Sequence, residues 1–320
     1  MPGVPVVRRR TLLLGAAAAT ALGGCAADPD YPAGPLRIAS GGTGGVYYAY
    51  ANGIADVIRT AVPRLRPAVL ATAASVENLQ MVVNGRAEIA FTTADAASDA
   101  IEGQPPFTRS LTIAALGRIY ENYMHLVIRL DRAITRVADL KGRRVSLGAL
   151  ASGTELFATR LMPLAGLGIE DLRAERLDPT VAARAVGEGR LDAMFFSGGI
   201  PTAAIADLAR KTPIGLLELG SFVPQLRSRY GEVYVERTIP ASAYGLGTST
   251  VTVGVANYLA VAAAMDERVG YQVTRALFEH RDRLAAAHPE GSRLDRGTAI
   301  STLPLPLHPG AARYYREAKR

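Results

Sequence analysis

The chain has 320 residues, of which 49% are apolar and 20% are charged. This length exceeds that of a usual single domain and the composition supplies a sizeable core, so we expect a globular protein of two lobes and exclude a disordered one. The formal net charge of +7 falls to +4 without Arg8, Arg9 and Arg10, which lie in a leader with no acidic residue. So small and scattered a charge gives no indication of nucleic acid as a partner.

Residues 1–24 have the proportions of a lipoprotein signal peptide. A basic start precedes a short apolar stretch at 12–22, which is too short to span a bilayer. The stretch ends in LGGC at 22–25, which resembles a bacterial lipobox and predicts lipidation of Cys25. The alternative is an ordinary thiol at a signal cleavage site. Because RRTLL at 9–13 resembles a twin-arginine signal, both the Sec and the twin-arginine export routes stay open.

Cys25 is the only cysteine of the sequence, so we expect no internal disulfide, no cysteine metal site and no thiol catalysis in the folded body. Residues 25–35 are rich in Pro, Ala, Gly and Asp and are interpreted as a flexible tether. No later stretch of the sequence has the length of an apolar membrane helix. We therefore predict an exported protein, anchored through its N-terminal lipid to the outer face of the cell membrane or in the periplasm.

From residue 36 onward, short apolar strands alternate with amphipathic helices. Strands are predicted at 36–39, 68–71, 88–92, 144–147, 191–196, 214–219 and 251–255, and helices at 49–59, 75–83, 95–102, 155–165, 202–210 and 268–286. Between the two series, apolar runs at 111–116 and 125–130 are joined by a polar, aromatic stretch at 117–123, which is interpreted as a linker. Strands separated by helices of this length predict parallel βαβ units in two α/β halves with a ligand cleft between them.

A glycine-rich loop, SGGTGGVYY at 40–48, stands between the first strand and the first helix. Glycines permit positive φ angles and close approach of a ligand, and the first N–H groups of the following helix lie free for a carboxylate or phosphate. The loop is therefore either a binding site or only a tight turn. Of the two adjoining tyrosines, Tyr47 is favoured over Tyr48 to face a ligand.

Other strand-to-helix junctions carry similar polar residues. Ser75, Asp95 and Ser152 are predicted helix N-caps, and Pro201 is predicted as a first helical residue. Each junction has a sufficient explanation as a helix cap. Because ligands gather at the strand ends that lead into helices, several helix N-termini converging there favour a small anion.

The sequence also lacks several signals of catalysis. No Lys-Ser/Thr pair follows the glycine loop, no third glycine stands at the dinucleotide spacing, and no Gly-x-Ser-x-Gly elbow occurs. The four histidines, at 125, 280, 288 and 308, have no metal-ligand spacing. We therefore predict a binding protein without cofactor, metal or catalytic residue.

Six motifs in order give the chain a family resemblance from residue 36 to about 317. They are GGTGGVYY at 41–48, SVENL at 75–79, DLKGRRV at 139–145, SGT at 152–154, GIPTA at 199–203 and LHPGA at 307–311. The chain resembles the TAXI-type solute receptors, the extracytoplasmic binding proteins of a class of tripartite ATP-independent periplasmic (TRAP) transporters. The resemblance implies a type II periplasmic-binding-protein fold, with residues 36–124 plus 245–320 as one lobe and 125–244 as the other.

The resemblance also implies function and partners. It implies a fused membrane permease, transport driven by an ion gradient, and a small carboxylate such as glutamate or 2-oxoglutarate as the ligand. Carried over position by position, the implied ligand contacts are Thr43, Gly44, Tyr47, Ser75, Asn78, Ser152, Gly153, Thr154 and Gly199. Arg118, on the crossing between the lobes, is either a two-pronged partner of the carboxylate or a surface residue.

Two other functions remain as alternatives. A ligand-binding sensor lipoprotein that reports to a membrane signalling protein would have the same fold and tether. An enzyme on a related two-lobed fold, such as a transferase acting on a phosphorylated substrate, would need a general base or metal site in the cleft, and the sequence shows neither cluster.

Overall fold

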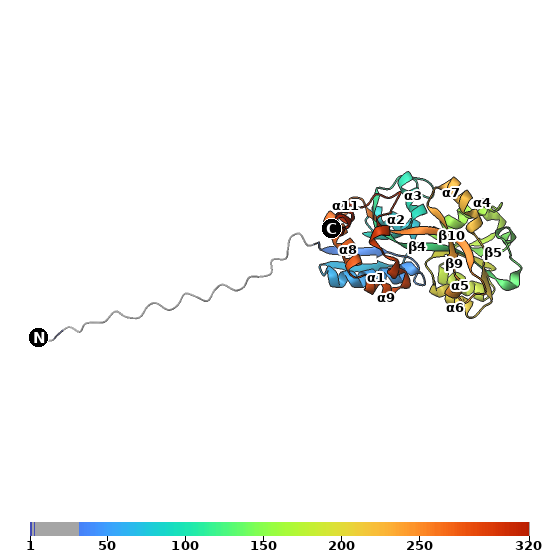
Figure 1. Ribbon diagram of the computed structural model, residues 1–320, viewed down its shortest axis with the longest axis horizontal. Coiled ribbons are helices and arrows are strands. Elements are labelled where there is room, and N and C mark those ends of the chain that lie inside the picture. Colours follow the sequence, from blue (N-terminus) through green and yellow to red (C-terminus); the bar gives the residue numbers. More distant parts are fainter. Residues whose placement is uncertain (2, 4–31, 320) are drawn as a thin grey trace. The chain divides into compact units, whose positions relative to one another are not determined.

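The computed structural model describes residues 1, 3 and 32–319 (Figure 1). All of the predicted signal peptide except residues 1 and 3, together with Cys25 and most of the predicted tether, lies outside the described residues. Pro32–Arg320 forms a compact unit of its own, and the following description concerns this unit. No helix among the described residues is long and apolar enough to cross a membrane.

A mixed sheet of ten strands forms the centre of the unit. Its order is β2-β1-β3-β10-β4-β7-β5-β6, while β8 also pairs with β4 and β9 with β10. The strands are β1 (Gly34–Ala39), β2 (Leu65–Leu70), β3 (Ile89–Thr93), β4 (Ile113–Arg129), β5 (Arg144–Ser146), β6 (Arg173–Glu175), β7 (Ala193–Gly198), β8 (Ile214–Leu216), β9 (Tyr234–Ile239) and β10 (Thr250–Ala262).

Two groups of parallel strands lie at the ends of this order. β1 pairs in parallel with β2 and β3, and β5 pairs in parallel with β6 and β7, which confirms the predicted parallel units. Between the groups, β4 and β10 are long and antiparallel to each other. β10 pairs antiparallel with β3 and β4 with β7, so this strand pair joins the two groups into one sheet.

The predicted linker at 117–123 is wrong, because these residues form the middle of the single strand β4. Its ladder with β10 continues from Leu259 opposite Gly117 to Gly254 opposite Tyr123, with register shifts beside Tyr258. The polar side chains that suggested a linker are compatible with a strand that pairs with β10 along this stretch.

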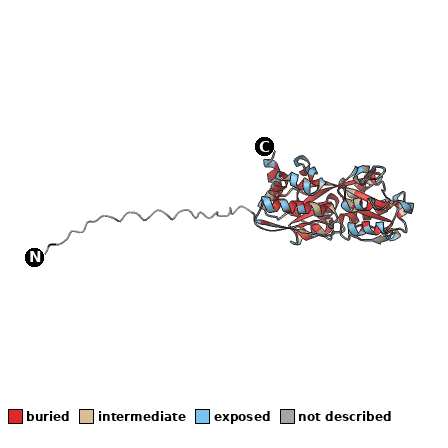
Figure 2. Ribbon diagram, turned by 90° about the horizontal axis from the view of Figure 1, so that it is seen from below, coloured by how far each residue is buried: buried red, intermediate tan, exposed pale blue. Residues whose placement is uncertain are grey.

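The helices cover the sheet on both faces. They are α1 (Val46–Ala61), α2 (Ser75–Val83), α3 (Ala94–Glu102), α4 (Gly153–Leu164), α5 (Pro179–Gly187), α6 (Ala203–Ala209), α7 (Val223–Tyr230), α8 (Glu267–Glu279), α9 (Arg281–Ala287), α10 (Arg296–Ala299) and α11 (Pro309–Glu317). Figure 1 shows α2 and α3 on the side of the sheet opposite α1 and α9, and α4 and α7 on the side opposite α5 and α6. Burial is concentrated in the strands and in the inward faces of the helices (Figure 2). All five residues of β3 are buried, as expected for a strand with helices on both faces.

The predicted helix at 268–286 is divided in the structure. His280 leaves the helical conformation, with φ −122° and ψ 34°, so that α8 ends before it and α9 begins after it. The break lets α9 turn toward α1, where Ala287 lies against Gly53. α5, α7 and α11 were not predicted from the sequence.

Candidate ligand-binding site

A cavity lies where the parallel strands of both groups end and lead into helices. Its volume is about 60 Å³, several times the roughly 10–15 Å³ that a cavity needs to hold a single water. The lining residues are Gly41, Gly42, Gly45, Val46, Tyr47, Thr72, Ala73, Ala74, Ser75, Thr93, Tyr120, Asn122, Gly148, Ala149, Ser152, Gly153, Thr154, Leu177, Asp178, Pro179, Phe195, Phe196, Ser197 and Gly198. This is the edge at which open α/β sheets bind ligands.

These residues form two walls and a floor. We call the lining residues at 41–47, 72–75 and 93 the first wall, and those at 148–154, 177–179 and 195–198 the second wall. The floor consists of Tyr120 and Asn122 in the middle of β4. The two walls therefore come from the two groups of parallel strands, and the floor comes from the strand pair that joins them.

The two walls touch each other directly. The Glu77 backbone N–H donates to the Ala151 carbonyl at 3.2 Å. A Cβ at Gly153 would lie 2.8 Å from the Ser75 hydroxyl oxygen, which is closer than such atoms approach. Gly42 and Gly44 likewise lie against residues that start α5, Asp178 and Thr180 respectively. The structure is thus in a closed arrangement in which glycines permit the walls to meet.

α2 and α4 begin on opposite walls. At the start of α4, the Ser152 hydroxyl accepts the Glu155 N–H at 3.0 Å, so the predicted N-cap is confirmed. The predicted N-cap at Ser75 is wrong: Ala74 is the cap, and the Ser75 hydroxyl accepts the Thr93 N–H at 3.2 Å. That hydrogen bond ties two loops of the first wall together.

A similar turn precedes each of these two helices. Glu77 accepts the N–H of Ala73 at 2.6 Å, and Glu155 accepts the N–H of Ala151 at 2.8 Å. Ala151 and Ala74 have positive φ values of 63° and 91°, a conformation that costs a non-glycine residue about 1–3 kcal/mol. Strain of this kind concentrates at ligand sites, where the surrounding structure holds it in place.

Two other predicted helix starts differ in the structure. Thr93 rather than Asp95 is the N-cap of α3, and Asp95 accepts the N–H of Ala96 at 2.8 Å from within the first turn. Pro201 is not helical, since α6 begins at Ala203 after the cap Thr202. Both errors shift a helix end by two residues and leave its position in the fold unchanged.

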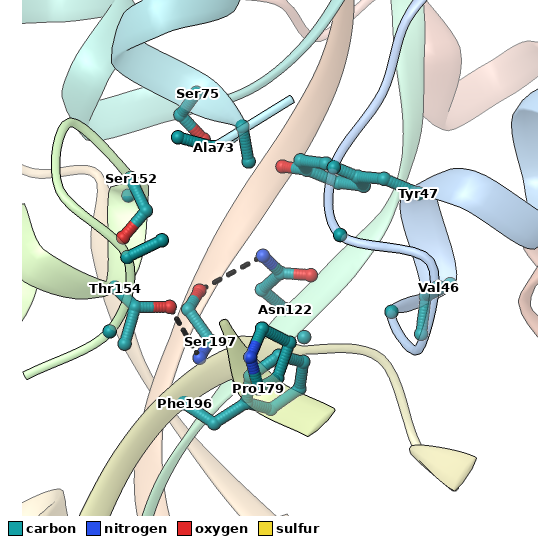
Figure 3. A pocket seen from close by; sticks show the side chains of 18 of the residues that line it. Val46, Tyr47, Ala73, Ser75, Asn122, Ser152, Thr154, Pro179, Phe196 and Ser197 are labelled. Carbon is teal, nitrogen blue, oxygen red and sulfur yellow. Dashed lines mark hydrogen bonds between the residues drawn. The ribbon is translucent and has the colours of Figure 1, made fainter. Parts of the chain in front are cut away.

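The floor is joined to the second wall by a short chain of hydrogen bonds (Figure 3). Asn122 Nδ2 donates to Ser197 Oγ at 2.9 Å, and the Ser197 N–H donates to Thr154 Oγ1 at 3.0 Å. Thr154 lies in the first turn of α4. The side chain on the floor is therefore only two hydrogen bonds from a helix N-terminus.

Tyr47 closes the cavity on the side of the first wall. Its ring packs against Phe91 at a centroid distance of 4.9 Å, and its hydroxyl donates to Asn257 Oδ1. Burial raises the pKa of Tyr47, an effect that hydrogen bonding with Ser75 and Asn122 partly opposes. Tyr47 therefore stays neutral at physiological pH, as a fixed hydroxyl within the wall.

The described side chains that line the cavity carry negative charge but no positive charge. The described lining residues include one carboxylate, Asp178, and no lysine, arginine or histidine. Asp178 is the N-cap of α5 and accepts the Thr180 N–H at 2.8 Å. Positive potential in the cavity comes from helix N-termini, whose free N–H groups carry partial charge. No group of three or more acidic, histidine or cysteine residues in the described part of the chain is placed to hold a metal ion.

Five of the residues implied by the family resemblance line the cavity, and one lies just behind it. The five are Tyr47, Ser75, Ser152, Gly153 and Thr154. Asn78 is fully buried but does not line the cavity: its Nδ2 donates to the carbonyls of Ser40 and Phe91 at 2.7 and 2.8 Å. Because its amide is used in holding these strand ends, Asn78 supports the first wall from behind.

Three other implied contacts lie outside the cavity. Thr43 is exposed, and Gly44 lies against Thr180 instead of the cavity. Gly199 follows the end of β7 and packs on Glu290, which accepts the Ile200 N–H at 3.0 Å. These three assignments need correction, since the chain at 43–44 reaches over to α5 and at 199–200 turns toward Glu290.

Arg118 is also outside the cavity. Its guanidinium forms an ion pair with Glu121, three residues further along β4, and its side chain is half-buried. Arg118 is not among the residues that line the cavity, so the structure gives no support to its interpretation as a ligand partner. The alternative, a residue of the outer face, agrees with the structure.

Sequence reasoning missed the floor and the acidic residue. Tyr120 and Asn122 were assigned to a linker, because nothing local indicates that β10 pairs with this stretch. Asp178 and Pro179 do carry a signal, since an Asp N-cap followed by proline is typical of a helix start. That signal would have located both α5 and one edge of the second wall.

Comparisons with known proteins agree with this architecture. A family model described as the NMT1-like family matches residues 38–318. The structure of MatC from Rhodopseudomonas palustris with bound malate is similar at a TM-score of 0.54, with 14% identity over 88% of this chain and 95% of that one. A structure from Bordetella bronchiseptica RB50 gives a TM-score of 0.53, with 19% identity over 89% and 88%. An ancestral arginine-binding protein bound to arginine gives 0.50, with 12% identity over 79% and 97%.

Proposed function

The chain belongs to the NMT1-like family and has the α/β fold of type II periplasmic binding proteins, and from this premise we propose that it is the solute receptor of a TRAP-type transporter. It binds a small organic anion of the glutamate or 2-oxoglutarate kind and delivers it to a fused membrane permease. The chain is lipidated at Cys25 and works outside the cell membrane, held there by its lipid.

One observation carries this proposal: a small closed cavity bounded by helix N-termini from both groups of parallel strands. Ser75 and Gly153, at the starts of α2 and α4, both line it and lie against each other. Two helix N-termini that meet in this way attract a carboxylate, each contributing about 0.3–1 kcal/mol, or up to about 2 kcal/mol where partly buried. The neighbouring structures hold malate and arginine, so the fold itself leaves the charge of the ligand open.

The lining favours binding over catalysis. Burial raises the pKa of both Tyr47 and Tyr120, so neither hydroxyl serves as a base near neutral pH. Asp178 has its carboxylate engaged in capping α5. A general base needs a pKa near the working pH and a position beside the proton that it removes, and these side chains do not supply that combination.

The mechanism follows from the contacts between the walls. We take residues 36–124 plus 245–320 and residues 125–244 as two lobes that turn about β4 and β10. A ligand that touches both walls binds the closed form more tightly than the open one, so it shifts the population toward closure. The closed form is then the one that the permease recognises.

The proposal is tested by the thermal stability of the purified protein with a panel of amino acids and mono- and dicarboxylates. A ligand present at 100 times its Kd should stabilise the folded state by about 2.7 kcal/mol. If no compound of the panel raises the melting temperature, the carboxylate assignment is overturned. Transport of the identified ligand by the cognate permease in proteoliposomes, dependent on this protein and an ion gradient, then separates a transport receptor from a sensor.

A further inference from the structure

The hydroxyl groups on the two walls of the cavity differ in where their protons go. Seven lining side chains of the walls carry a hydroxyl group: Tyr47, Thr72, Ser75 and Thr93 on the first wall, and Ser152, Thr154 and Ser197 on the second. A hydroxyl group has one proton to donate and can also accept hydrogen bonds. The hydrogen bonds around the walls therefore show which of these protons are committed within the protein and which are available to a ligand.

Tyr47 and Ser75 on the first wall commit their protons to one chain of hydrogen bonds. The Tyr47 hydroxyl donates to Asn257 Oδ1. Ser75 forms a hydrogen bond with Tyr47 that opposes the rise in the pKa of Tyr47 caused by burial. Because Tyr47 has given its own proton to Asn257, this second bond uses the proton of Ser75.

The two threonines of the first wall also donate within the protein. The Thr72 hydroxyl donates to Asn78 Oδ1 at 2.6 Å, and the Thr93 hydroxyl donates to Ser75 Oγ at 3.4 Å. Among the described residues, the first wall therefore has no hydroxyl proton left for a ligand.

The hydroxyl groups of the second wall show the opposite pattern. Ser152 Oγ accepts the Glu155 N–H at 3.0 Å, and Thr154 Oγ1 accepts the Ser197 N–H at 3.0 Å. Ser197 Oγ accepts a hydrogen bond from Asn122 Nδ2 at 2.9 Å. None of the three hydroxyls donates to another described residue, so these bonds fix the oxygens and leave all three protons free.

The three free protons belong to one side of the cavity. Figure 3 shows the oxygens of Ser152, Thr154 and Ser197 on the side away from Tyr47. Ser152 and Thr154 stand at the start of α4, where the N–H groups of the first two helical residues, Gly153 and Thr154, have no partner within the helix. Since the described lining residues include no lysine, arginine or histidine, this side offers O–H and N–H donors that carry no formal charge.

Such a set of donors calls for a group that only accepts. Ser152 and Thr154 are 5% and 8% exposed, and buried polar groups of native proteins are nearly always paired. A carboxylate has two oxygens with about four acceptor positions and no proton, so it can accept from several of these donors at once. A primary amide of the same shape would turn an NH₂ group toward them, donor against donor.

We propose that the second wall holds the carboxylate of the ligand through the hydroxyl groups of Ser152, Thr154 and Ser197, and that these donors make the site select a carboxylate over the corresponding primary amide. Ser197 lies in none of the six sequence motifs and is assigned here from its position and its free proton. The first wall then faces the remainder of the ligand. This inference rests on the proposed function, since it takes a small carboxylate as the ligand.

The test compares acids with their primary amides by titration calorimetry on the purified protein. One set is L-glutamate with L-isoglutamine and L-glutamine, which carry the amide at the α-carboxyl and at the side-chain carboxyl respectively. The others are pyruvate with pyruvamide and propionate with propionamide. Replacing the carboxylate that meets the second wall should weaken binding at least 100-fold, because a site built to hydrogen-bond one group rejects an analogue that leaves its polar groups unpaired.

Variants on the two walls locate the donors. Thr154→Val keeps the shape of the side chain and removes its hydroxyl group, and Ser197→Ala removes the hydroxyl group of β7. Each should reduce the preference for acid over amide about tenfold or more, since a hydrogen bond to a charged group contributes roughly ten- to 100-fold. Thr154→Ser keeps the hydroxyl group and should keep the wild-type preference.

Thr93→Val is the matched variant on the first wall. It should affect acid and amide to a similar extent, so that their ratio stays within threefold of the wild-type ratio. Thr60→Val, at an exposed position of α1, controls for the substitution itself. If Thr154→Val does not fold, Ser197→Ala and Thr93→Val still distinguish the two walls.

The results separate this inference from the proposed function. An acid that binds no more tightly than its amides, or a preference that survives both Thr154→Val and Ser197→Ala, rejects the role of the second wall and leaves the carboxylate receptor standing. A loss of preference in Thr93→Val as large as in Ser197→Ala also rejects it, because the first wall would then hold the carboxylate. Binding of no acid, either in these sets or in the panel described above, rejects both proposals.

Discussion

Gly153 and Ser75 stand opposite each other in the closed cavity, so close that a Cβ on Gly153 would lie 2.8 Å from Ser75 Oγ and 3.1 Å from Thr93 Oγ1. The three atoms belong to the starts of α4 and α2 and to the end of β3. Because close-packed interiors have no room for such an atom, a side chain at Gly153 would separate the two walls.

Gly153→Val should therefore weaken ligand binding about tenfold or more, while the melting temperature without ligand changes little. Closure that is disfavoured by about 1.4 kcal/mol lowers the apparent affinity by a factor of ten. Calorimetry with the identified ligand measures the affinity, and Gly247→Val is the matched control, because a Cβ at Gly247 meets nothing within 4 Å. Equal affinities of the two variants would show that the contact between the walls is not needed for binding.

The sequence predicts those features of this site that depend on local chemistry. The glycines of the 40–48 loop and the pair Ser152 and Glu155 each predict a strand-to-helix junction to within a few residues. In the structure α1 and α4 begin at these two places. The physics of helix caps is local, so neither a partner strand nor a distant helix is needed to detect it.

The floor of the cavity could not be predicted in this way. Asn122 lies opposite Val255 of β10, a strand that comes much later in the chain, and its polarity suggested a loop. Strand pairing between segments so far apart in the sequence depends on the whole fold, and tertiary context overrides local preference there.

A buried ion pair links α3 and α4 beside the site. Arg160 Nη2 lies 2.5 and 2.6 Å from the two carboxylate oxygens of Asp99, and Nη1 donates to Tyr234 Oη at 2.8 Å. Tyr234 in turn donates to Asp95 Oδ2 at 3.0 Å. Arg160 is thus the cation that neutralises two buried carboxylates.

Arg160→Met should lower the free energy of unfolding by about 3–5 kcal/mol, since it leaves buried carboxylates without their cation. Chemical denaturation at pH 7 measures this loss. Arg59→Met is the control, because the pair of Arg59 with Asp56 is exposed and such pairs contribute about 0–1 kcal/mol. The double variant Arg160→Met with Asp99→Leu should recover part of the loss. A loss no larger than that of Arg59→Met would show that the cluster is solvated.

The lipid anchor at Cys25 is a prediction from the sequence, and Cys25 lies outside the described residues. Cys25→Ala should abolish incorporation of labelled fatty acid and move the protein from the membrane fraction to the soluble fraction after cell lysis. One acyl chain binds membranes only weakly, whereas two or more anchor a protein stably. If Cys25→Ala remains fully in the membrane fraction, the anchor is not the lipid on this cysteine.

The burial of His125, on β4 near the floor, predicts how the stability of the fold depends on pH. It is 1% exposed and neutral in the fold: Nδ1 meets the Tyr123 carbonyl and Nε2 the Tyr244 hydroxyl, both at 2.8 Å. Burial lowers the pKa of His125 to about 4, from an ordinary 6.5. Between these values the unfolded chain binds a proton that the folded chain does not, so folding loses stability as the pH falls from 6.5 to 4.

At 1.36 kcal/mol for each pH unit, the contribution of His125 to this loss is about 3 kcal/mol. Unfolding by urea at pH 7 and pH 4 measures the loss, and His125→Gln should reduce it by most of that amount, because glutamine does not titrate. Comparing His280→Gln controls for the general effect of losing a histidine, since His280 is only partly buried and follows the end of α8. A wild-type loss that His125→Gln leaves unchanged would mean that other groups, such as carboxylates, dominate acid unfolding.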